Sequence, residues 1–320
     1  MTDYSFVIPC YDSAKTITGV VEEINKAMSS IDGSFDIVLV NDASPKDNTK
    51  EVIFNLAKQY DNITAVSFAK NFGQHAALMA GLRYSDGNYV ICMDDDGQTP
   101  ASEVSRLIDK LNEGYDVVFA RYNVKHHSSF RNFGSRVNDY MARKLINKPK
   151  ELYMSSYFIA RRYVIDEVCR YQGPFPYISG LLLRTTSNVT NVEIDHRSRE
   201  SGESGYTFSK LLKLWLNGFT AFSVKPLRFS ALCGCVISLI GLIVTIYALV
   251  NKFTNPDAVV GWTSLIGVIS LVGGAILLTL GLTGEYIGRI YIHINNSPQY
   301  VIRDCNRKET VNGKAYEEQK

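Results

Sequence analysis

Three adjacent carboxylates, Asp94, Asp95 and Asp96, directly follow an apolar run from Tyr89 to Met93. Side chains of like charge at this spacing repel one another by about 1 to 4 kcal/mol per pair, depending on how well water screens them. Mg²⁺ or Mn²⁺ would offset the repulsion, because these ions take oxygen ligands and commonly combine one or two protein carboxylates with substrate phosphates. The triplet therefore predicts a metal and nucleotide site. The alternative is a solvated acidic turn ahead of a helix that begins at Pro100.

The elements that position this triplet follow from the hydrophobic pattern of the first part of the chain. The expected strands are Ser5–Ile8, Phe35–Val40, Ile63–Ser67, Tyr89–Met93 and Asp116–Ala120. Amphipathic helices are expected between them, near residues 17–28, 52–56, 76–82 and 104–111. This alternation is typical of a parallel, doubly wound α/β sheet, in which ligands bind beyond the carboxyl ends of the strands.

Polar clusters follow the first four expected strands. They are Pro9–Asp12, Asn41–Ser44, Lys70–His75 and the aspartate triplet. Because the carboxyl ends of parallel strands share one edge of the sheet, we expect the four loops to converge, which favours a binding site over unrelated turns. The chain has no Gly-x-Gly-x-x-Gly after the first strand and no Gly-Lys-Ser/Thr loop, which argues against a dinucleotide-binding dehydrogenase or a P-loop ATPase. A metal ion is therefore expected to hold the ligand phosphates.

Two long uncharged stretches lie in the C-terminal part of the chain. Residues 229–251 form a run of 23 and residues 258–284 a run of 27 without a charged side chain. At about 1.5 Å per helical residue, either run is long enough to cross a hydrocarbon core of about 30 Å. We predict two transmembrane helices; the alternative is a pair of buried core helices. Tyr206–Phe222, with leucines and a tryptophan opposite its lysines, predicts an interfacial helix ahead of them.

The distribution of basic residues predicts the membrane topology. Lys225 and Arg228 precede the first uncharged run. Arg289, Arg303 and Arg307 follow the second. The positive-inside rule then places both termini in the cytoplasm. No secretory signal precedes the first strand, so the bulk of the chain is expected to be cytoplasmic too. The net charge of +2 gives no indication of nucleic-acid binding.

Six motifs, in order along nearly the whole chain, resemble those of a known family. They are Val7–Asp12, Val40–Ser44, Asn71–Ala77, Met93–Pro100, Arg199–Tyr206 and Gly284–Tyr291. The family is that of the membrane-anchored family-2 glycosyltransferases that load a sugar onto a polyprenyl phosphate, such as undecaprenyl or dolichyl phosphate. Each motif alone is a weak signal, whereas six in order, with two apolar runs behind them, are specific. The resemblance implies an α/β nucleotide-sugar-binding domain with the A-type glycosyltransferase fold.

The resemblance also implies four regions. Residues 1–205 form the cytosolic glycosyltransferase domain, 206–228 the amphipathic interfacial region, 229–284 the two-helix transmembrane hairpin and 285–320 a cytosolic tail. The polar end of the tail, residues 306–320, is predicted to be disordered. Such a chain is expected to be a multi-pass protein of the bacterial inner membrane.

The resemblance assigns roles to residues of the four loops. The implied donor-binding set is Pro9, Tyr11, Asp12, Asp42, Asn71, Gln74 and Asp94. The implied ligands of a Mg²⁺ or Mn²⁺ ion are Asp94, Asp96 and Gln98. Asp95 stands where the family usually has a small residue, so it receives no role.

The acceptor side departs from the family pattern. Many members have a Gly-Asp-Tyr/Phe segment whose aspartate serves the acceptor, whereas this chain has Ser155 and Ser156 there, with Glu151 as the alternative if the register shifts. The expected contacts of the acceptor phosphate are Arg131, Arg199 and Ser155. The expected catalytic residues are Asp94, Asp96, Arg199 and Ser156. A surface salt bridge is the alternative role of Arg199.

The leading hypothesis is an inverting, metal-dependent enzyme that transfers a sugar from a nucleotide-sugar donor, expected to be a UDP-sugar, to undecaprenyl phosphate at the cytoplasmic membrane face. A second hypothesis changes the acceptor to a lipid-linked oligosaccharide or polysaccharide, because the acceptor-side aspartate is missing. A third is a non-catalytic membrane scaffold that retains a nucleotide pocket. Gly267, Gly273 and Gly274 permit close helix packing and predict a homo-oligomer.

Overall fold

The structure is a computed structural model that describes residues 2–122, 143, 148–174, 176–194, 262–295 and 297–307, and positions 227, 230–234, 236–237, 239–241, 243, 246 and 250. It divides into two compact units: Met1–Thr207 with Ser297–Lys320, and Phe208–Asn296. Arg131, Arg199 and the interfacial helix predicted at Tyr206–Phe222 lie outside the described residues.

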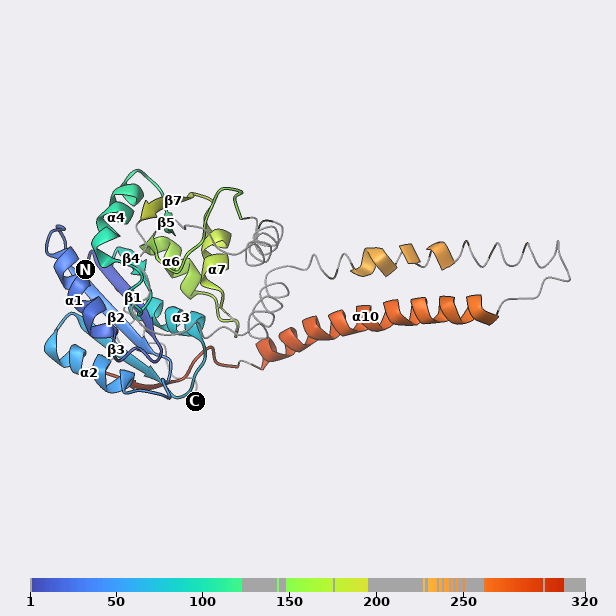
Figure 1. The fold of residues 1–320 in the computed structure, drawn as a ribbon, viewed down its shortest axis with the longest axis horizontal. Helices are drawn as coiled ribbons and strands as arrows, with labels where there is room; N and C mark the ends of the chain where they lie inside the picture. The colour runs from blue at the N-terminus through green and yellow to red at the C-terminus, as the bar shows by residue number, and fades with distance from the viewer. Residues whose placement is uncertain are drawn as a thin grey trace. The chain divides into compact units, whose positions relative to one another are not determined.

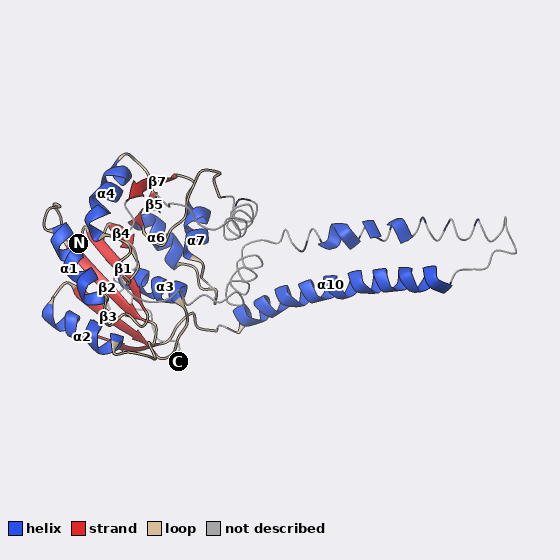
Figure 2. Ribbon diagram, viewed as in Figure 1, coloured by secondary structure: helices blue, strands red, loops and turns tan. Residues whose placement is uncertain are grey.

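A mixed β-sheet forms the centre of the first unit. Its strands are β1 (Tyr4–Cys10), β2 (Phe35–Asn41), β3 (Ile63–Phe68), β4 (Tyr89–Cys92), β5 (Val117–Tyr122), β6 (Phe158–Arg161), β7 (Val189–Ile194) and β8 (Ile302–Cys305). They lie in the order β7-β5-β6-β4-β1-β2-β3-β8. Figure 2 shows the strands in red and labels those from β1 to β5 and β7. β1 pairs in parallel with β2 and β4, β2 with β3, and β5 with β7. The α/β alternation expected from the hydrophobic pattern is confirmed.

The sheet is not parallel throughout, and this part of the prediction is wrong. β6 is antiparallel to β4 and β5, and β8 is antiparallel to β3. The register pairs Cys92 with Phe158 and Phe68 with Ile302. Because an antiparallel strand begins where its neighbour ends, the residues ahead of β6 and β8 lie at the same sheet edge as the loops after β1 to β4.

Helices cover both faces of the sheet (Figure 1). On one face lie α1 (Ile17–Met28), α2 (Thr49–Gln59), the 3₁₀ turn η1 (Ala101–Glu103) and α4 (Val104–Asn112). On the other lie α3 (Gln74–Tyr84), α6 (Arg162–Cys169) and α7 (Ile178–Thr185). The buried residues of α1 recur every three or four positions: Ile17, Val20, Val21, Ile24 and Met28. This spacing forms a single apolar stripe, which explains why α1 packs one side on the sheet.

Helix α3 approaches the sheet especially closely. A Cβ atom at Gly81 would lie 2.3 Å from Val7 Cγ1, so only glycine allows this contact. The loop between β3 and α3 is short, ending at Gly73, whose φ of +94° strongly favours glycine. The close packing of α3 therefore fixes where the helix begins, at Gln74.

The chain returns to the sheet after the second unit, which the sequence did not predict. β8 forms the edge beside β3, and the Asn306 side chain continues the pairing by accepting from Ala65 N–H at 2.8 Å and donating to Ile63 O at 3.2 Å. The Arg307 guanidinium pairs with the Asp86 carboxylate. The predicted disorder is thus wrong for Asn306 and Arg307, whereas residues 308–320 lie outside the described part.

The second unit contains α10 (Trp262–Ile294), a helix of 33 residues that continues past the end of the predicted second span. Among the described residues, one helix is long and apolar enough to cross a membrane, with its best window at Leu271–Gly288. A shorter apolar helical stretch runs from Ser230 to Gly241. Ser230 Oγ lies 3.0 Å from Thr279 Oγ1, which joins this stretch to α10 within the unit. The hairpin of two spans stays a prediction.

Candidate active site

Asp94 is held between two side chains that come from different loops. Gln74 Nε2, at the start of α3, donates to Asp94 Oδ1 at 3.0 Å. The Ser156 hydroxyl, from the segment ahead of β6, donates to Asp94 Oδ2. Both were predicted as site residues, but only the antiparallel entry of β6 explains how Ser156 reaches the aspartate strand. Because each carboxylate oxygen accepts a hydrogen bond, the orientation of the Asp94 side chain is fixed. A fixed orientation suits a carboxylate that binds a metal ion together with a phosphate group.

Asp96 and Gln98 lie on the turn that follows. Asp96 Oδ1 accepts a hydrogen bond from the backbone N–H of Gln98 at 3.1 Å, so the carboxylate also orders this turn. The described residues contain no group of three or more His, Cys, Asp or Glu side chains able to hold a metal by themselves. Asp94, Asp96 and Gln98 nevertheless offer oxygen atoms, and Mg²⁺ or Mn²⁺ bound with a nucleotide diphosphate needs only one or two protein carboxylates. The donor set therefore fits a metal whose coordination the substrate completes.

Asp95 connects the fourth loop to the first loop and the start of α1. Its Oδ2 accepts from the Tyr11 backbone N–H at 2.9 Å, and its carbonyl oxygen accepts from Thr16 Oγ1 at 2.6 Å. Burial raises the pKa of the Asp95 carboxyl to about 6, and the Tyr11 hydrogen bond opposes that rise. Sequence reasoning assigned Asp95 no role; the carboxylate connects two loops of the site.

Asp42 organises the loop after β3. Its carboxylate accepts from Phe72 N–H at 2.7 Å and from Gly73 N–H at 2.8 Å. Asn71 Nδ2 lies 3.4 Å from the Asp42 carbonyl oxygen. Burial raises the pKa of Asp42, while the two N–H donors lower it. The predicted donor-binding residues Asp42 and Asn71 are thus brought together, with the carboxylate directed at the loop backbone.

The first loop carries the other predicted donor residues. Pro9 lies within β1, opposite Val40 of β2. The Tyr11 side chain is 46% exposed and is available to a ligand. Asp12 adopts a φ of +54°, and its Oδ1 accepts from the Lys46 N–H at 3.2 Å. A non-glycine residue with a positive φ is uncommon, and such strain is often found at functional loops.

The acceptor side is only partly described. Ser155 Oγ donates to the Tyr157 carbonyl oxygen at 2.7 Å, so its hydroxyl proton is already used. Glu151 is exposed. Of the acceptor-side candidates within the described ranges, Ser156 is therefore the residue in contact with the aspartates.

Aromatic residues near the aspartates escaped the sequence analysis. Burial raises the pKa of Tyr122 at the end of β5, and the negative charges of Asp94 and Asp96 add to that rise. The Tyr122 ring meets the Tyr153 ring edge to face at 6.5 Å. The Asn191 side chain of β7 accepts from the Tyr153 backbone N–H at 2.7 Å and donates to the Tyr153 carbonyl oxygen at 2.6 Å. No residue spacing signals this cluster, because its members come from three separate segments.

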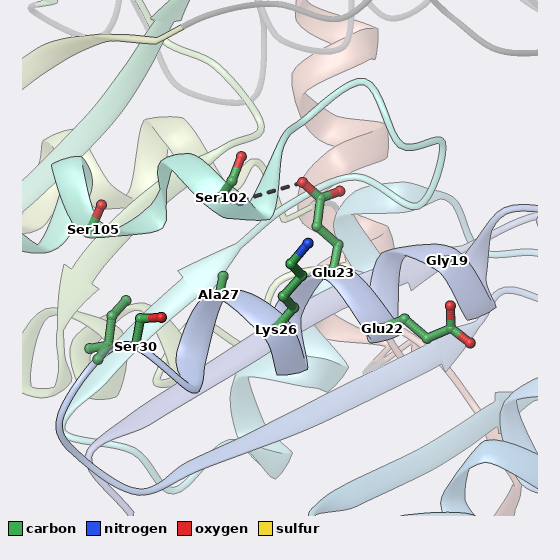
Figure 3. A pocket seen from close by; sticks show the side chains of 9 residues that line it. Gly19, Glu22, Glu23, Lys26, Ala27, Ser30, Ser102 and Ser105 are labelled. Atoms are coloured by element: carbon green, nitrogen blue, oxygen red, sulfur yellow. Dashed lines mark hydrogen bonds between the residues drawn. The ribbon is translucent and has the colours of Figure 1, made fainter.

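A groove lies between α1 and the segment that contains η1 and the start of α4 (Figure 3). It has a volume of about 780 Å³ and is lined by Gly19, Glu22, Glu23, Lys26, Ala27, Ser30, Ile31, Ser102 and Ser105. A volume of this size is within the range of small-ligand sites. The Ser102 N–H donates to Glu23 Oε1 at 3.5 Å, and both residues line the groove. None of the predicted site residues lines it, however. We therefore place the candidate active site at the edge of the sheet where the four loops lie, rather than in this groove.

The family of the chain follows from comparison with known proteins. Residues 5–169, which span β1 to β6 except for Tyr4 and contain all four polar loops, match the family described as Glycosyl transferase family 2. The chain belongs to glycosyltransferase family 2. This glycosyltransferase is 32% identical over 305 residues to the undecaprenyl-phosphate 4-deoxy-4-formamido-L-arabinose transferase of Proteus mirabilis (strain HI4320), covering 93% of this chain and 92% of the relative. The resemblance to polyprenyl-phosphate sugar transferases is confirmed, and the protein is an enzyme.

Further relatives cover the chain to a similar extent. The glycosyltransferase is 30% identical over 304 residues to the uncharacterized glycosyltransferase YkcC of Bacillus subtilis (strain 168), covering 94% of this chain and 93% of the relative. Among solved structures, glucosyl-3-phosphoglycerate synthase from Mycobacterium tuberculosis in complex with Mn²⁺ and UDP-glucose gives a TM-score of 0.50 at 19% identity, covering 68% of this chain and 77% of that chain. This likeness supports the A-type fold expected from the sequence.

Proposed function

We propose that this glycosyltransferase moves one sugar from a nucleotide-sugar donor, first of all a UDP-sugar, to undecaprenyl phosphate or a similar polyprenyl phosphate. The observation that carries the proposal is the meeting of Gln74 and Ser156 on the two oxygens of Asp94. One side chain comes from the predicted donor loop and the other from the predicted acceptor segment. Donor and acceptor would therefore meet at the Asp94 carboxylate, as group transfer requires.

The donor side of the proposal rests on the oxygen atoms of the fourth loop. When bound there, Mg²⁺ or Mn²⁺ would stabilise the negative charge that develops on the leaving diphosphate. Asp94 and Asp96 would supply carboxylate ligands and Gln98 an amide oxygen, while Gln74 keeps Asp94 in orientation. Mn²⁺ is the first ion to test, because the mycobacterial synthase of the same fold was solved with Mn²⁺ and UDP-glucose bound.

The acceptor side needs positioning more than deprotonation. A lipid monophosphate is already an anion and can attack the anomeric carbon directly, with inversion of configuration. Ser156 would position it beside Asp94, together with Arg131 and Arg199, whose guanidinium groups suit bidentate phosphate binding. We place Ser156 ahead of Ser155 in this role because the Ser156 hydroxyl contacts Asp94, whereas the Ser155 hydroxyl contacts the Tyr157 carbonyl oxygen.

The membrane part of the proposal rests on α10 and on the relatives. The name of the Proteus mirabilis relative specifies undecaprenyl phosphate, a lipid that lies in the membrane. The apolar window Leu271–Gly288 of α10 suits a membrane span. We propose two spans in the bacterial inner membrane, both termini in the cytoplasm, the four regions given above, and self-association through Gly267, Gly273 and Gly274.

The decisive experiment is a transfer assay with the full-length enzyme, Mn²⁺ and undecaprenyl phosphate. Labelled UDP-glucose, UDP-galactose, UDP-N-acetylhexosamines and GDP-mannose are supplied one at a time, and lipid is extracted. We expect labelled lipid from one donor, with NMR showing an anomeric configuration opposite to that of the donor. If no donor labels the lipid, the proposal is wrong. Label that appears only after adding lipid-linked oligosaccharide would favour that acceptor, which the missing acceptor-side aspartate makes the second candidate.

A further inference from the structure

The five residues ahead of β8, 297–301, form a segment that we call the C-terminal strap. It belongs to the same compact unit as the sheet. Gln299 is only 8% exposed, and its Nε2 donates to the carbonyl oxygens of Tyr171 at 2.8 Å and Gly173 at 2.7 Å. Val301 O accepts from the backbone N–H of Ala69 at 2.9 Å. The strap is therefore fixed against the first residue of the loop that joins β3 to α3.

The Tyr300 ring begins a chain of contacts that ends at Asp42. It stacks on the Phe68 ring with centroids 5.1 Å apart and an interplanar angle of 6°. Phe68 in turn meets Phe72 edge to face, with centroids 5.8 Å apart at 87°. The backbone N–H of Phe72 donates to Asp42 Oδ1 at 2.7 Å. Two contacts between rings and one hydrogen bond therefore connect Tyr300 to the Asp42 carboxylate, which holds the predicted donor loop.

The Tyr300 hydroxyl contacts the helix on the other side of that loop. Arg83, in the last turn of α3, donates from Nη1 to Tyr300 Oη at 3.0 Å. The same guanidinium lies over the Tyr300 ring at 5.6 Å from its centroid and donates from Nη2 to Tyr171 O at 3.1 Å. Tyr300 therefore joins β3, which leads into the loop, to α3, which leads out of it. The hydroxyl contacts Arg83 of α3, whereas the ring contacts both Arg83 and Phe68.

We propose that Tyr300 is a positioning residue for the donor nucleotide, acting through Phe68 and Phe72 on the loop that Asp42 anchors. The proposal rests on the proposed function, because it assumes that the loop binds the donor. With the Tyr300 ring absent, Phe68 and Phe72 gain room to move, and the two N–H groups bound to Asp42 move with them. Tyr300 follows α10 by only a few residues, so the segment that leaves this helix is the one that supports the donor loop.

The test compares Tyr300→Leu with Tyr300→Phe in the full-length enzyme. Leucine removes the ring, and phenylalanine removes only the hydroxyl. We expect Tyr300→Leu to raise the donor KM about three- to tenfold, with kcat and the KM for undecaprenyl phosphate within about twofold of the wild type. Tyr300→Phe is expected to stay within about twofold in all three constants, because the stacked ring remains.

The matched control is Tyr89→Leu. Tyr89 is the first residue of β4, at the opposite end of the strands from the four loops, and its ring centroid lies 5.6 Å from that of Tyr4. Like Tyr300→Leu, this variant loses one contact between aromatic rings and one cation–π contact, here with Arg161, and it is expected to keep the wild-type donor KM. An equal rise in donor KM for Tyr89→Leu and Tyr300→Leu would overturn the proposal, because the effect would then be general loss of stability.

A second readout needs no donor. Hydrogen exchange of the Phe72 and Gly73 amides, measured on peptides that cover the loop, reports their bonds to Asp42 directly. We expect faster exchange in Tyr300→Leu and not in Tyr89→Leu; unchanged exchange would overturn the proposal. If the enzyme uses no nucleotide sugar, the proposed function is wrong. The exchange data would still show whether the Tyr300 ring holds the loop that Asp42 anchors.

Phe72→Leu tests the same path from the loop side. If the rings act in series, the double variant Tyr300→Leu/Phe72→Leu has a donor KM no higher than about twofold above the worse single variant. Multiplied effects would mean that the two rings act independently and would overturn the proposal. Phe72→Leu also keeps the proposal testable if Tyr300→Leu does not fold, because an unchanged donor KM in that variant would exclude the path through Phe72.

Discussion

Two antiparallel strands, β6 and β8, enter a largely parallel sheet and each brings the residues ahead of it to the site edge. β6 lies beside β4 and places Ser156 on the Asp94 carboxylate. β8 lies beside β3 and places Tyr300 on the Phe68 ring. The same topological arrangement thus brings a hydroxyl group to one side of the site and an aromatic ring to the other.

The difference indicates which step each segment serves. A hydroxyl bound to a carboxylate is a charge-assisted contact, about twice as strong as a neutral hydrogen bond, and it is useful where charge changes during reaction. A stacked ring supplies shape and about 0.5 to 1.5 kcal/mol beyond its buried area, which suits the support of a loop. Changes ahead of β6 should therefore lower kcat, whereas changes ahead of β8 should raise the donor KM.

The largest effect is expected at the aspartates on the β6 side. Asp96→Asn removes a proposed metal ligand and should lower kcat at least about a hundredfold, because the charge on the leaving diphosphate loses its stabilisation. Asp95→Asn is the matched control: an amide oxygen still accepts from the Tyr11 N–H, so we expect a loss of less than about tenfold. Steady-state transfer assays with saturating Mn²⁺ measure both. Full activity of Asp96→Asn, or of the wild type in excess EDTA, would contradict the metal assignment.

The two serines ahead of β6 give the next largest contrast. Ser156→Ala removes the hydroxyl on Asp94 and should lower kcat about ten- to a hundredfold with little change in donor KM. Ser155→Ala removes only a bond to the Tyr157 carbonyl oxygen and should cost less than about fivefold. Rate measurements over a range of acceptor concentrations separate kcat from KM. Equal losses at both positions would show that the segment has only a structural role.

Asn306 tests whether β8 is needed for stability rather than for chemistry. Asn306→Ala leaves the Ala65 N–H and the Ile63 carbonyl oxygen without this partner and should cost about 1 to 3 kcal/mol. Thermal melts in detergent should show Tm lowered by a few degrees, with the kcat of the folded enzyme retained at 25 °C. A lowered kcat with an unchanged Tm would mean that β8 contributes to the reaction step, against the contrast with β6.

His75 is the second residue of α3 and directly follows Gln74. Burial lowers the pKa of its imidazole from 6.5 to about 4, and among the described residues its Nδ1 has no hydrogen-bond partner. Between these pH values the unfolded chain binds a proton at His75 that the folded chain does not bind. The free energy of unfolding therefore decreases as the pH falls from about 6.5 towards 4.

His75→Phe keeps an aromatic ring against Tyr177, whose centroid lies 5.2 Å from that of His75. Relative to this variant, the wild type should lose up to about 2 kcal/mol of stability between about pH 6.5 and pH 5, the smallest of the expected effects. Melting curves across that range measure the difference in Tm. If the Tm values of the two proteins change with pH in the same way, the pKa of His75 is not lowered in the folded enzyme.

Residues that are neighbours in sequence were predicted well. The strands and the polar loops at their ends follow from hydrophobic alternation and from the strand-end rule. The hydrogen bond between Gln74 and Asp94, which joins two of these loops, was not itself predicted. The contact of Asp95 with the first loop was not predicted, because the direction of a side chain in a turn depends on which loop donates to it, here through Tyr11 N–H. The contact of Ser156 with Asp94 needed an antiparallel strand of only four residues, Phe158–Arg161, too short for a periodic signal.

The sequence by itself determined the family, the α/β alternation and the oxygen-rich edge of the sheet, because these depend on local pattern and on motifs in order. Only the tertiary structure decided what lies opposite each loop. Ser156 and Tyr300 are 62 and more than 200 positions from the residues that they serve, and strand pairing at long range joins them. Such pairing is stabilised by side chains brought together by the whole sheet, so no short stretch of sequence specifies it.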